Sequence, residues 1–222
     1  MKILFQGDSI TDGNRYKEKS QEWDKNHQIG HSYVYPIVSL LGSRYPERDY
    51  TFINRGVSGD RTDTLLARWE ADTLQHQPDV LCLLCGTNDS FSALPQEKGS
   101  VDVSGVLQRY EKLLCMTKES CPNIKLVIFE PFHGYPVEKQ QEQSVLCGIA
   151  RLQGIQSGVR ALADKYGAIF IELQRVFEDA FQIREHSYWI WDGIHPTEAG
   201  HGLIVKAFFE ATKELFDCDG KY

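Results

Sequence analysis

The amino-acid sequence predicts an α/β fold in which a five-stranded parallel sheet carries helices on both faces. Short apolar runs typical of strands alternate, about five times, with longer segments whose apolar residues recur at helical spacing. The run 79–85 is almost continuously apolar, as in a central strand that helices cover on both faces. No linker rich in Pro, Gly or Ser interrupts the 222 residues, so we expect a single domain over 1–222.

The expected strands are bounded by residues that end them. Gly7 follows the first apolar run, Gly56 closes the second, and Pro131 closes the fourth. We therefore expect the five strands at 2–6, 50–54, 79–85, 125–129 and 168–173.

The expected helices fill the intervals between the strands. The first stops before Gly42, and the second places Leu65, Leu66, Trp69 and Leu74 on one face. We expect helices at 32–41, 62–74, 103–117, 143–165 and 197–215. The polar stretches 14–30, 90–102 and 133–142 are expected as loops. Each follows the C-terminal end of a strand, where open α/β sheets bind their ligands.

Charge and hydropathy argue against two classes of partner. The chain has 24 Lys plus Arg against 31 Asp plus Glu, a net charge of −7, whereas nucleic-acid phosphates need a basic face. No apolar run approaches the roughly 20 residues of a membrane-spanning helix, so no membrane partner is expected. Gln6, Gly7 and Asp8 interrupt the chain's first apolar run before a signal-peptide core could form, which predicts a cytoplasmic protein.

The cysteines are typical of a reducing compartment rather than of a disulfide scaffold. There are six in the chain, and Cys82 and Cys85 form a C-x-x-C pair inside an apolar run. The simplest interpretation is two small apolar side chains of a buried strand. A zinc site needs a second ligand pair at matching spacing, and none is evident, so no metal is expected.

A serine directly follows the first expected strand, in the segment Gly7-Asp8-Ser9-Ile10-Thr11. A serine at a strand-to-helix turn exposes its Oγ at the sheet edge, and the start of the helix favours developing negative charge. Asp and Ser after a strand are equally common as helix N-caps, so this segment alone leaves both interpretations open. The elbow G-x-S-x-G of α/β-hydrolases is absent.

Two further polar segments follow the second and third strands. In Gly56-Val57-Ser58-Gly59-Asp60, the Gly59 N–H is placed to donate to an oxyanion, although a plain turn fits the same residues. In Gly86-Thr87-Asn88-Asp89, the Asn88 amide offers an uncharged donor, although an Asx-turn is an equally good interpretation.

An acid and a base stand three residues apart near the end of the chain, in Trp191-Asp192-Gly193-Ile194-His195-Pro196. The Asp192 carboxylate can accept the Nδ1 proton of His195 and leave its Nε2 as a base. The alternative is a helix cap beside a surface histidine. Carboxyl ends of parallel strands share one edge, so the four segments together supply the nucleophile, base, orienting acid and oxyanion donors of acyl transfer, with no cofactor.

These four segments, in this order, resemble the blocks of the SGNH (GDSL-type) hydrolases. The resemblance spans Lys2 to about Leu215, with Ile10 where the family name has Leu. It implies a flavodoxin-like three-layer α/β/α sandwich. It also implies Ser9 as nucleophile, His195 as base and Asp192 as its orienting acid, with an oxyanion hole made by the N–H groups of Ser9 and Gly59 and the side chain of Asn88.

Within that family the chain resembles small intracellular carbohydrate acetylesterases of the acetylxylan esterase kind, on the residues Ala67-Arg68-Trp69-Glu70, Trp191-Asp192 and Ala199-Gly200-His201. The resemblance implies a serine esterase that hydrolyses small acyl esters, chiefly O-acetyl groups on carbohydrates. We expect Asp8 and Trp191 to contact substrate. Aromatic residues at the strand ends are candidates for stacking on sugar rings, for lining a fatty-acyl pocket or for plain packing: Trp23, Tyr33, Phe91, Phe132, Trp189 and Trp191.

Several alternatives stay open at this point. The same catalytic groups suit a lysophospholipase or an acyl-thioesterase, and the fold suits a non-catalytic carbohydrate- or protein-binding module. A nucleotide-binding domain is disfavoured, because both G-x-G-x-x-G and G-x-x-x-x-G-K-[ST] are absent. The expected partner is a small-molecule ester, and the oligomeric state, a homo-oligomer included, is left open.

Overall fold

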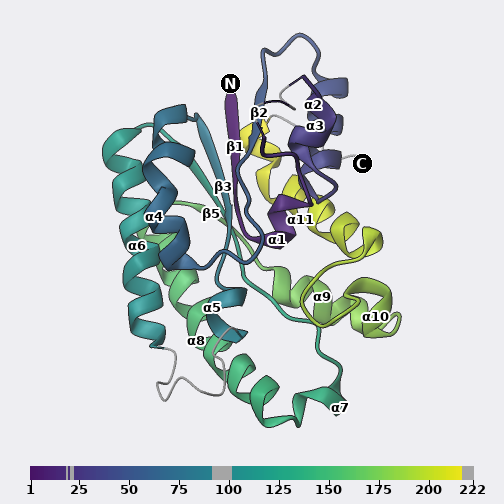
Figure 1. The fold of residues 1–222 in the computed structure, drawn as a ribbon. Helices are drawn as coiled ribbons and strands as arrows, with labels where there is room; N and C mark the ends of the chain where they lie inside the picture. Colours follow the sequence, from purple (N-terminus) through teal and green to yellow (C-terminus); the bar gives the residue numbers. More distant parts are fainter. Residues whose placement is uncertain (19, 21–22, 92–101, 217–222) are drawn as a thin grey trace.

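The computed structural model describes residues 1–18, 20, 23–91 and 102–216. Five strands form one sheet in the order β2-β1-β3-β4-β5, and every neighbouring pair is parallel. The strands are β1 (Lys2–Gly7), β2 (Thr51–Asn54), β3 (Val80–Leu84), β4 (Lys125–Phe129) and β5 (Ile169–Ile171). Figure 1 shows the sheet between two layers of helices. The predicted α/β/α sandwich is thus confirmed, with the strand order of flavodoxin-like folds.

The register places the C-terminal ends of β1, β2 and β3 side by side. Phe5 of β1 pairs with Asn54 of β2 and with Cys82 of β3, and Gly7 pairs with Leu84. The segments that follow these strands therefore leave the sheet at the same edge, the lower one in Figure 1.

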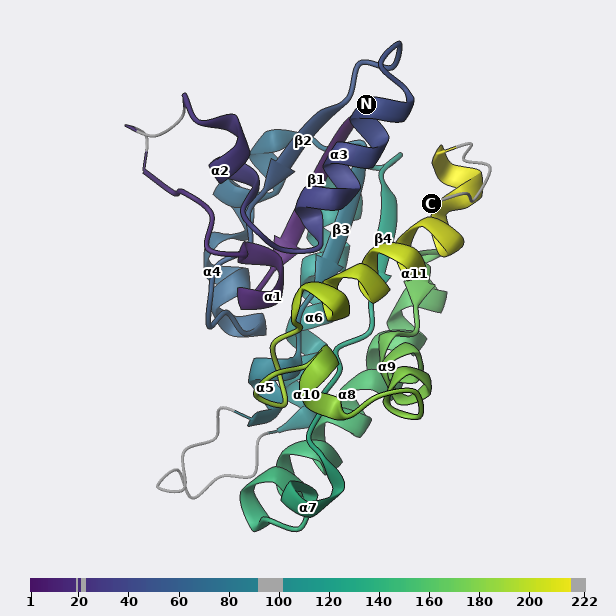
Figure 2. The same ribbon diagram turned by 90° about the vertical axis from the view of Figure 1, so that its right-hand side faces the viewer.

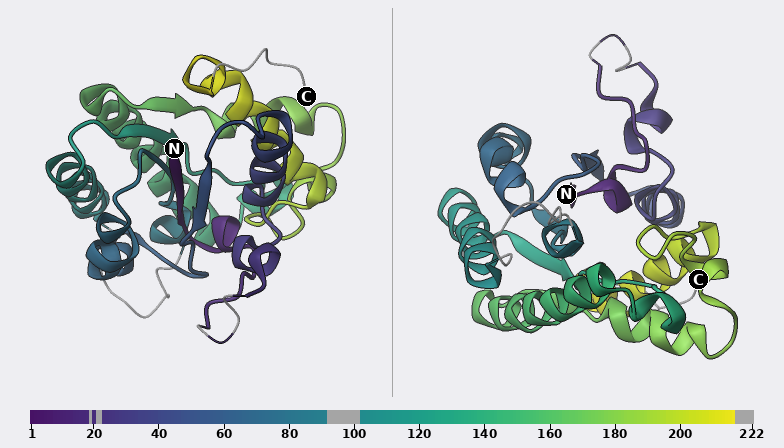
Figure 3. Two further views of the ribbon diagram at one scale, coloured as in Figure 1. Left: turned by 90° about the horizontal axis from the view of Figure 1, so that it is seen from above. Right: turned by 60° about the horizontal axis from the view of Figure 1, so that its bottom comes forward.

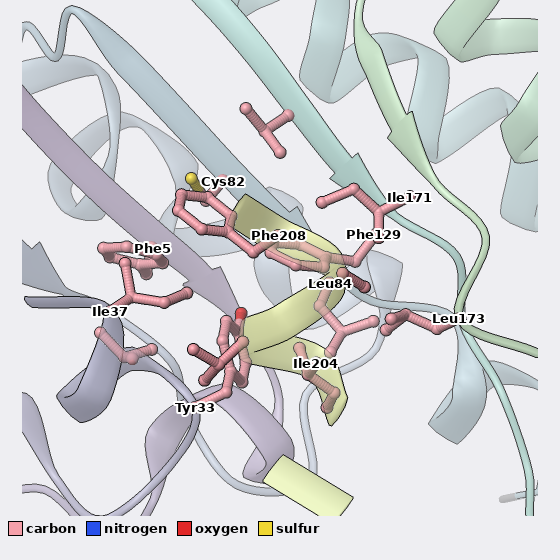
Figure 4. Packing of buried hydrophobic residues seen from close by; sticks show 14 of the residues in the cluster. Phe5, Tyr33, Ile37, Cys82, Leu84, Phe129, Ile171, Leu173, Ile204 and Phe208 are labelled. Carbon is pink, nitrogen blue, oxygen red and sulfur yellow. The ribbon is translucent and has the colours of Figure 1, made fainter. Parts of the chain in front are cut away.

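One face of the sheet is covered by α3 (Val34–Arg44), α9 (Leu173–Phe181) and α11 (Glu198–Phe216). Phe5 and Phe129 of the sheet pack against Phe208 of α11, with ring centroids 6.5 and 6.1 Å apart. Figure 4 shows Tyr33 and Ile37 beside these rings. These five side chains are fully removed from water, and such burial provides most of the driving force for docking this layer of helices on the sheet.

The other face is covered by α4 (Thr62–Asp72), α6 (Val103–Ser120) and α8 (Gln143–Tyr166). Leu4 and Leu83 pack there, and the buried Trp69 of α4 donates its indole N–H to Thr117 Oγ1 of α6 at 3.0 Å. Seen from above, the blue and teal helices of this layer lie on the opposite side of the sheet from the yellow α11 (Figure 3). Leu4 and Phe5 are both fully buried on opposite faces, so the strand shows no polar alternation.

The helix α9 is absent from the sequence prediction, which extended the last strand to residue 173. The strand ends at Ile171, and Leu173 begins a helix in which Leu173, Phe177 and Ala180 are buried at helical spacing. The break between the two elements falls at Glu172, which precedes the first residue of α9. The result is a helix packed on α11.

Two of the expected loops contain short helices. The stretch 14–30 includes α2 (Lys25–Ile29), which begins where the Asp24 carboxylate accepts the His27 N–H at 3.1 Å. The stretch 133–142 includes α7 (Val137–Gln140). Most of the stretch 90–102 lies outside the described residues, and Ser90 itself belongs to α5 (Thr87–Phe91). The remaining short elements are α1 (Ser9–Asp12), the 3₁₀ turn η2 (Leu74–His76) and α10 (His186–Trp189).

The C-x-x-C pair lies in the core, as its interpretation as packing predicted. Cys82 faces the α11 layer and Cys85 the α6 layer, both almost fully buried, and burial raises the pKa of both thiols. Within the described residues both are free thiols, and no cluster of three or more His, Cys, Asp or Glu side chains is arranged to hold a metal ion. Cys218 lies outside those residues. No helix in the described part has the length and apolarity to span a membrane.

Candidate active site

The turn after β1 places Ser9 at the sheet edge. Ser9 begins α1, and the Asp8 carboxylate caps that helix by accepting the Ile10 N–H at 3.0 Å. The turn is tight: a Cβ on Gly7 would lie 2.3 Å from the Leu84 carbonyl oxygen and 2.5 Å from Thr11 Oγ1. Only glycine fits this close approach, so Gly7 allows the chain to turn and present the hydroxyl.

Ser9, His195 and Asp192 form a continuous hydrogen-bonded relay. Ser9 Oγ lies 2.8 Å from His195 Nε2, and His195 Nδ1 lies 2.7 Å from Asp192 Oδ2. The other carboxylate oxygen of Asp192 accepts the backbone N–H of Ile194 at 2.9 Å and of His195 at 2.7 Å. Partial burial alone would raise the Asp192 pKa, but these hydrogen bonds and the imidazole outweigh it and lower the pKa below its usual value. Asp192 is therefore ionised at neutral pH, ready to hold the Nδ1 proton.

The loop that carries the acid and the base closes on itself. Ile190 and Pro196 form an antiparallel bridge, and the Trp191 N–H donates to the His195 carbonyl at 3.1 Å. Gly193 has φ +94°, which favours glycine, and a Cβ there would collide with the Tyr135 ring at 2.5 Å. The closed loop therefore keeps the Asp192 carboxylate within hydrogen-bond distance of the His195 imidazole, although the two residues are three positions apart.

Gly59 presents an unpartnered backbone donor at the same edge. Its φ is +85°, and an added Cβ would meet no atom within 4 Å. Its neighbours all donate to protein acceptors: the N–H groups of Arg55, Gly56, Val57, Ser58 and Asp60 bond to Phe5 O, Asn54 Oδ1, Gly7 O, Asp12 Oδ2 and Val57 O at 2.8–3.1 Å. Within the described part of the chain the Gly59 N–H has no acceptor, and neither has that of Ser9. Two such donors suit an external anion.

Asn88 joins the third segment to the second. Its Nδ2 donates to the carbonyl of Asp60 at 3.0 Å, one residue beyond Gly59. Asn88 belongs to α5, directly after β3, and its side chain is only half-buried. The structure therefore brings the Asn88 amide beside the loop 55–60 that carries Gly59, as predicted for segments that follow parallel strands at one edge of the sheet.

Asp8 does not lie where a substrate contact was expected. Its side chain is buried, with only 2% of the residue exposed, and caps α1. Burial raises its pKa to about 7; the Ile10 N–H and His195 lower it, whereas Asp89 and Asp60 raise it. The Asp8 side chain is therefore placed to cap α1, with almost none of its surface exposed at the site.

The six candidate aromatic residues divide by exposure. Tyr33 and Phe132 are fully buried, so of the three interpretations left open for these rings they fit plain packing; Phe132 stacks on Phe177 with ring centroids 4.5 Å apart in the core. Periodicity alone did not distinguish these packing residues from surface ones. Phe91 is half-buried against Tyr135, and Trp189 is also half-buried. Trp23 and Trp191 are 78% and 63% exposed.

Trp191 adjoins both the relay and a groove. Its ring stacks on the His195 imidazole with centroids 5.7 Å apart at an angle of 21°. Trp191 and Asp192 line a groove of about 440 Å³ between α7 and α10. Cavities of about 630 and 690 Å³ lie away from the relay, at the N-terminal ends of β3 and β4 and beside β2. The groove at Trp191 shares a wall with the relay, whereas neither of these two larger cavities is lined by Ser9, Asp192 or His195.

Sequence reasoning gave Arg68 no role at the site. Its guanidinium bonds to the Asp60 carboxylate at 2.5 and 2.8 Å, to Asp72 at 2.8 Å and to Gln6 at 3.0 Å. Arg68 thus braces the residue whose carbonyl holds Asn88. The spacing of Arg68 and Asp72 on one helix was a signal for an ion pair, but the bond to Asp60 depends on tertiary structure.

Comparison with known proteins agrees with this geometry. Residues 5–203 match the model of the GDSL-like lipase/acylhydrolase family. An acetylxylan esterase of Geobacillus stearothermophilus is 29% identical over 211 residues, which cover 93% of this chain and 91% of that protein. A protein described as a GDSL-like lipase from Parabacteroides merdae has a similar structure, with a TM-score of 0.82 at 33% identity over 95% of this chain and 94% of that one.

A solved structure of an acetylxylan esterase from Geobacillus stearothermophilus superposes with a TM-score of 0.79 at 25% identity, covering 95% of this chain and 93% of that chain. The family match extends over most of the sequence and includes all the segments that meet at the sheet edge. The chain therefore belongs to the GDSL-like lipase/acylhydrolase family, as the SGNH resemblance implied, and is a carboxylic ester hydrolase.

Proposed function

We propose that this esterase removes small acyl groups, chiefly acetyl, from the hydroxyls of carbohydrates through an acyl-enzyme on Ser9. The observation that carries the proposal is the relay from Ser9 Oγ to His195 Nε2 at 2.8 Å and from His195 Nδ1 to Asp192 at 2.7 Å. The name of the relative that matches 93% of the chain, an acetylxylan esterase, supports the substrate class.

In the acylation step Ser9 Oγ attacks the ester carbonyl carbon while His195 Nε2 takes the hydroxyl proton. The carbonyl oxygen becomes an oxyanion, and the imidazolium is stabilised by Asp192, which holds the Nδ1–H. The imidazolium then gives the proton from Nε2 to the leaving sugar oxygen as the carbon–oxygen bond breaks. Ser9 is left esterified with the acyl group.

In the deacylation step water attacks the acyl carbon and gives its proton to His195 Nε2. A second oxyanion forms and collapses, and the same proton passes to Ser9 Oγ as the acid leaves. Besides the ester and water, these steps use only groups of this chain, and the relay returns to its starting state once both acylation and deacylation are complete.

The N–H groups of Ser9 and Gly59 and the Asn88 amide are proposed as the oxyanion donors. Support comes from the two backbone donors that have no acceptor in the described structure and from the bond that ties Asn88 to the Gly59 loop. Removing one such donor lowers kcat by about 10²–10³-fold in known cases.

The exposed Trp191 ring is proposed to stack on a sugar of the substrate. Support comes from the position of the ring against His195, because a sugar stacked on it would lie on the side of the base, from which the leaving oxygen receives its proton. The adjoining groove between α7 and α10 offers space for the remainder of the alcohol.

The proposal is tested with purified protein on acetylated xylo-oligosaccharides, on p-nitrophenyl acetate and octanoate, on lysophosphatidylcholine and on palmitoyl-coenzyme A. We expect acetate release from the oligosaccharides, preference for acetate over octanoate, and labelling by a fluorophosphonate that is absent in Ser9→Ala. Preference for octanoate or for the lipid substrates would contradict an acetylesterase and indicate a lysophospholipase or a thioesterase. Absence of labelling would contradict the proposal that Ser9 forms an acyl-enzyme.

A further inference from the structure

We propose that Asp12 is a positioning residue of this esterase: it ties the nucleophile helix α1 to the loop that carries Gly59 and so fixes the oxyanion donor relative to Ser9. This inference rests on the proposed role of Gly59 in the oxyanion hole. Asp12 lies one turn of helix after Ser9, on the same four-residue element.

The first support is a pair of contacts that bracket the loop. Asp12 Oδ2 accepts the Ser58 N–H at 3.0 Å, and Arg15 Nε donates to the Gly56 carbonyl at 3.0 Å. Asp12 is the last residue of α1 and Arg15 lies in the turn that follows it, and their two contacts lie on either side of Val57. The loop is therefore held to α1 by side chains just before Gly59.

The second support is the close approach of the two backbones. A Cβ on Gly56 would lie 2.4 Å from the Asp12 nitrogen. The Asn54 Nδ2 donates to the Thr11 carbonyl at 2.8 Å. The loop therefore lies directly against α1. The hydrogen bond from the Ser58 N–H to Asp12 joins two segments whose backbones are already in contact.

The third support is the way in which both neighbours of Gly59 are restrained. The Ser58 N–H is held by Asp12 at 3.0 Å, and the Asp60 N–H is held by the Val57 carbonyl at 3.1 Å. Peptide groups are planar, so fixing the groups before and after Gly59 leaves its own N–H little freedom to rotate. Of these two hydrogen bonds, the one made by Asp12 ties the loop to α1, whereas the other lies within the loop.

The charge of Asp12 is balanced in place. Its side chain is only 3% exposed, and its Oδ2 accepts from Lys17 Nζ at 2.7 Å, with Arg15 Nε 3.9 Å from Oδ1. A buried carboxylate is costly unless it is paired, and these two cations supply the pairing. An ionised acceptor also makes the bond to Ser58 stronger than a neutral one would be.

The test compares Asp12→Ala with Asp12→Asn on p-nitrophenyl acetate. Asp12→Ala removes the acceptor of the Ser58 N–H, and we expect kcat to fall by about 10- to 100-fold with KM within about threefold, because a displaced oxyanion donor acts in the transition state. Asp12→Asn keeps an oxygen acceptor and is expected to restore kcat to within about fivefold of the parent. The inhibition constant of methylboronic acid, which forms a tetrahedral adduct on a serine, should rise in Asp12→Ala by the factor by which kcat/KM falls.

The matched control is Ser32→Ala. The buried Ser32 Oγ donates to the Thr11 carbonyl at 2.8 Å, so this variant loosens α1 without touching the Gly59 loop. We expect it to lower Tm about as much as Asp12→Ala and to keep kcat within about twofold. The proposal is overturned if Ser32→Ala loses as much kcat as Asp12→Ala, if the loss in Asp12→Ala lies in KM, or if Asp12→Asn is as impaired as Asp12→Ala. If the parent protein is active and labelled by the probe and Asp12→Ala is fully active, only the positioning role of Asp12 is contradicted. If the parent protein is inactive, the proposed function itself is contradicted.

Discussion

Ser9 and His195 stand 186 positions apart in the sequence, yet Ser9 Oγ and His195 Nε2 are 2.8 Å apart. The contact joins the first turn after β1 to the loop between α10 and α11, and Figure 2 shows α1 and α10 on the same side of the molecule as α11. The imidazole needs no movement to reach the hydroxyl, so the proton-transfer geometry is preorganised.

Asp192→Asn should lower kcat by about 10³- to 10⁴-fold while the protein remains folded. The amide oxygen can still accept the backbone N–H groups of Ile194 and His195, which keeps the loop closed. The amide nitrogen would then face His195 Nδ1 and favour the tautomer whose proton is on Nε2, where it cannot accept from Ser9. Steady-state kinetics with a thermal melt measure this; a loss of less than about tenfold would mean that the acid only supports the loop.

Asp8→Asn should stabilise the protein at alkaline pH more than at acidic pH. The pKa of the buried Asp8 is raised to about 7, whereas an Asp in the unfolded chain titrates near 4. Between these values the native state holds a proton that the unfolded state has lost, so the Asp8 carboxyl makes stability fall as pH rises. Asparagine still caps α1 but does not titrate.

We expect the advantage of Asp8→Asn in the free energy of unfolding to grow by about 1–3 kcal/mol between pH 5 and pH 8. Urea unfolding at the two pH values gives this difference directly. An advantage that stays constant with pH would contradict a native state that retains the Asp8 proton.

Gly56→Ala should destabilise the fold more than Gly59→Ala, although the two glycines lie in one loop. A Cβ at position 56 would be 2.4 Å from the Asp12 nitrogen, a clash with backbone that costs about 1–3 kcal/mol or more. A Cβ at position 59 meets open space, so only its φ of +85° is penalised, by about 1 kcal/mol. Urea denaturation of both variants compares them, and equal losses would show that the loop does not press on α1.

Trp191→Ala should weaken the binding of acetylated oligosaccharides, raising KM by about 3- to 10-fold through the loss of ring stacking. The increase should be smaller for p-nitrophenyl acetate, which lacks a sugar, and Trp191→Phe should recover part of the loss. Initial rates on both substrates test this. An equal effect on the two substrates would mean that the ring acts on His195 rather than on carbohydrate.

Local patterns were sufficient to predict the sheet and the four polar segments at its edge. Short apolar runs such as 79–85 and 125–129, bounded by residues that end strands, indicate covered strands, and parallel strands bring the segments after them together. The spacing of Asp192 and His195 was equally local. What the sequence could not supply was contact between distant segments.

Asp12 and Ser58 are an example: they lie 46 positions apart, and neither residue type signals the bond between them. Tyr33 is another, because an aromatic residue near a strand end is equally compatible with a binding surface and with the core, where it bonds to Thr11 through its hydroxyl at 3.0 Å. The helix α9 was missed because the expected strand was extended past Glu172 to Leu173, the first residue of that helix.

The bridge between Ile190 and Pro196 closes one loop around Asp192 and His195, so the acid and the base of the relay move together. If this loop shifts, the hydrogen bond that is lost is the one between His195 and Ser9. Distortion of this loop would therefore break the hydrogen bond from Ser9 to His195 but keep the one from His195 to Asp192. Such a form would be inactive, and the NMR signals of the His195 ring would still report the hydrogen bond to Asp192.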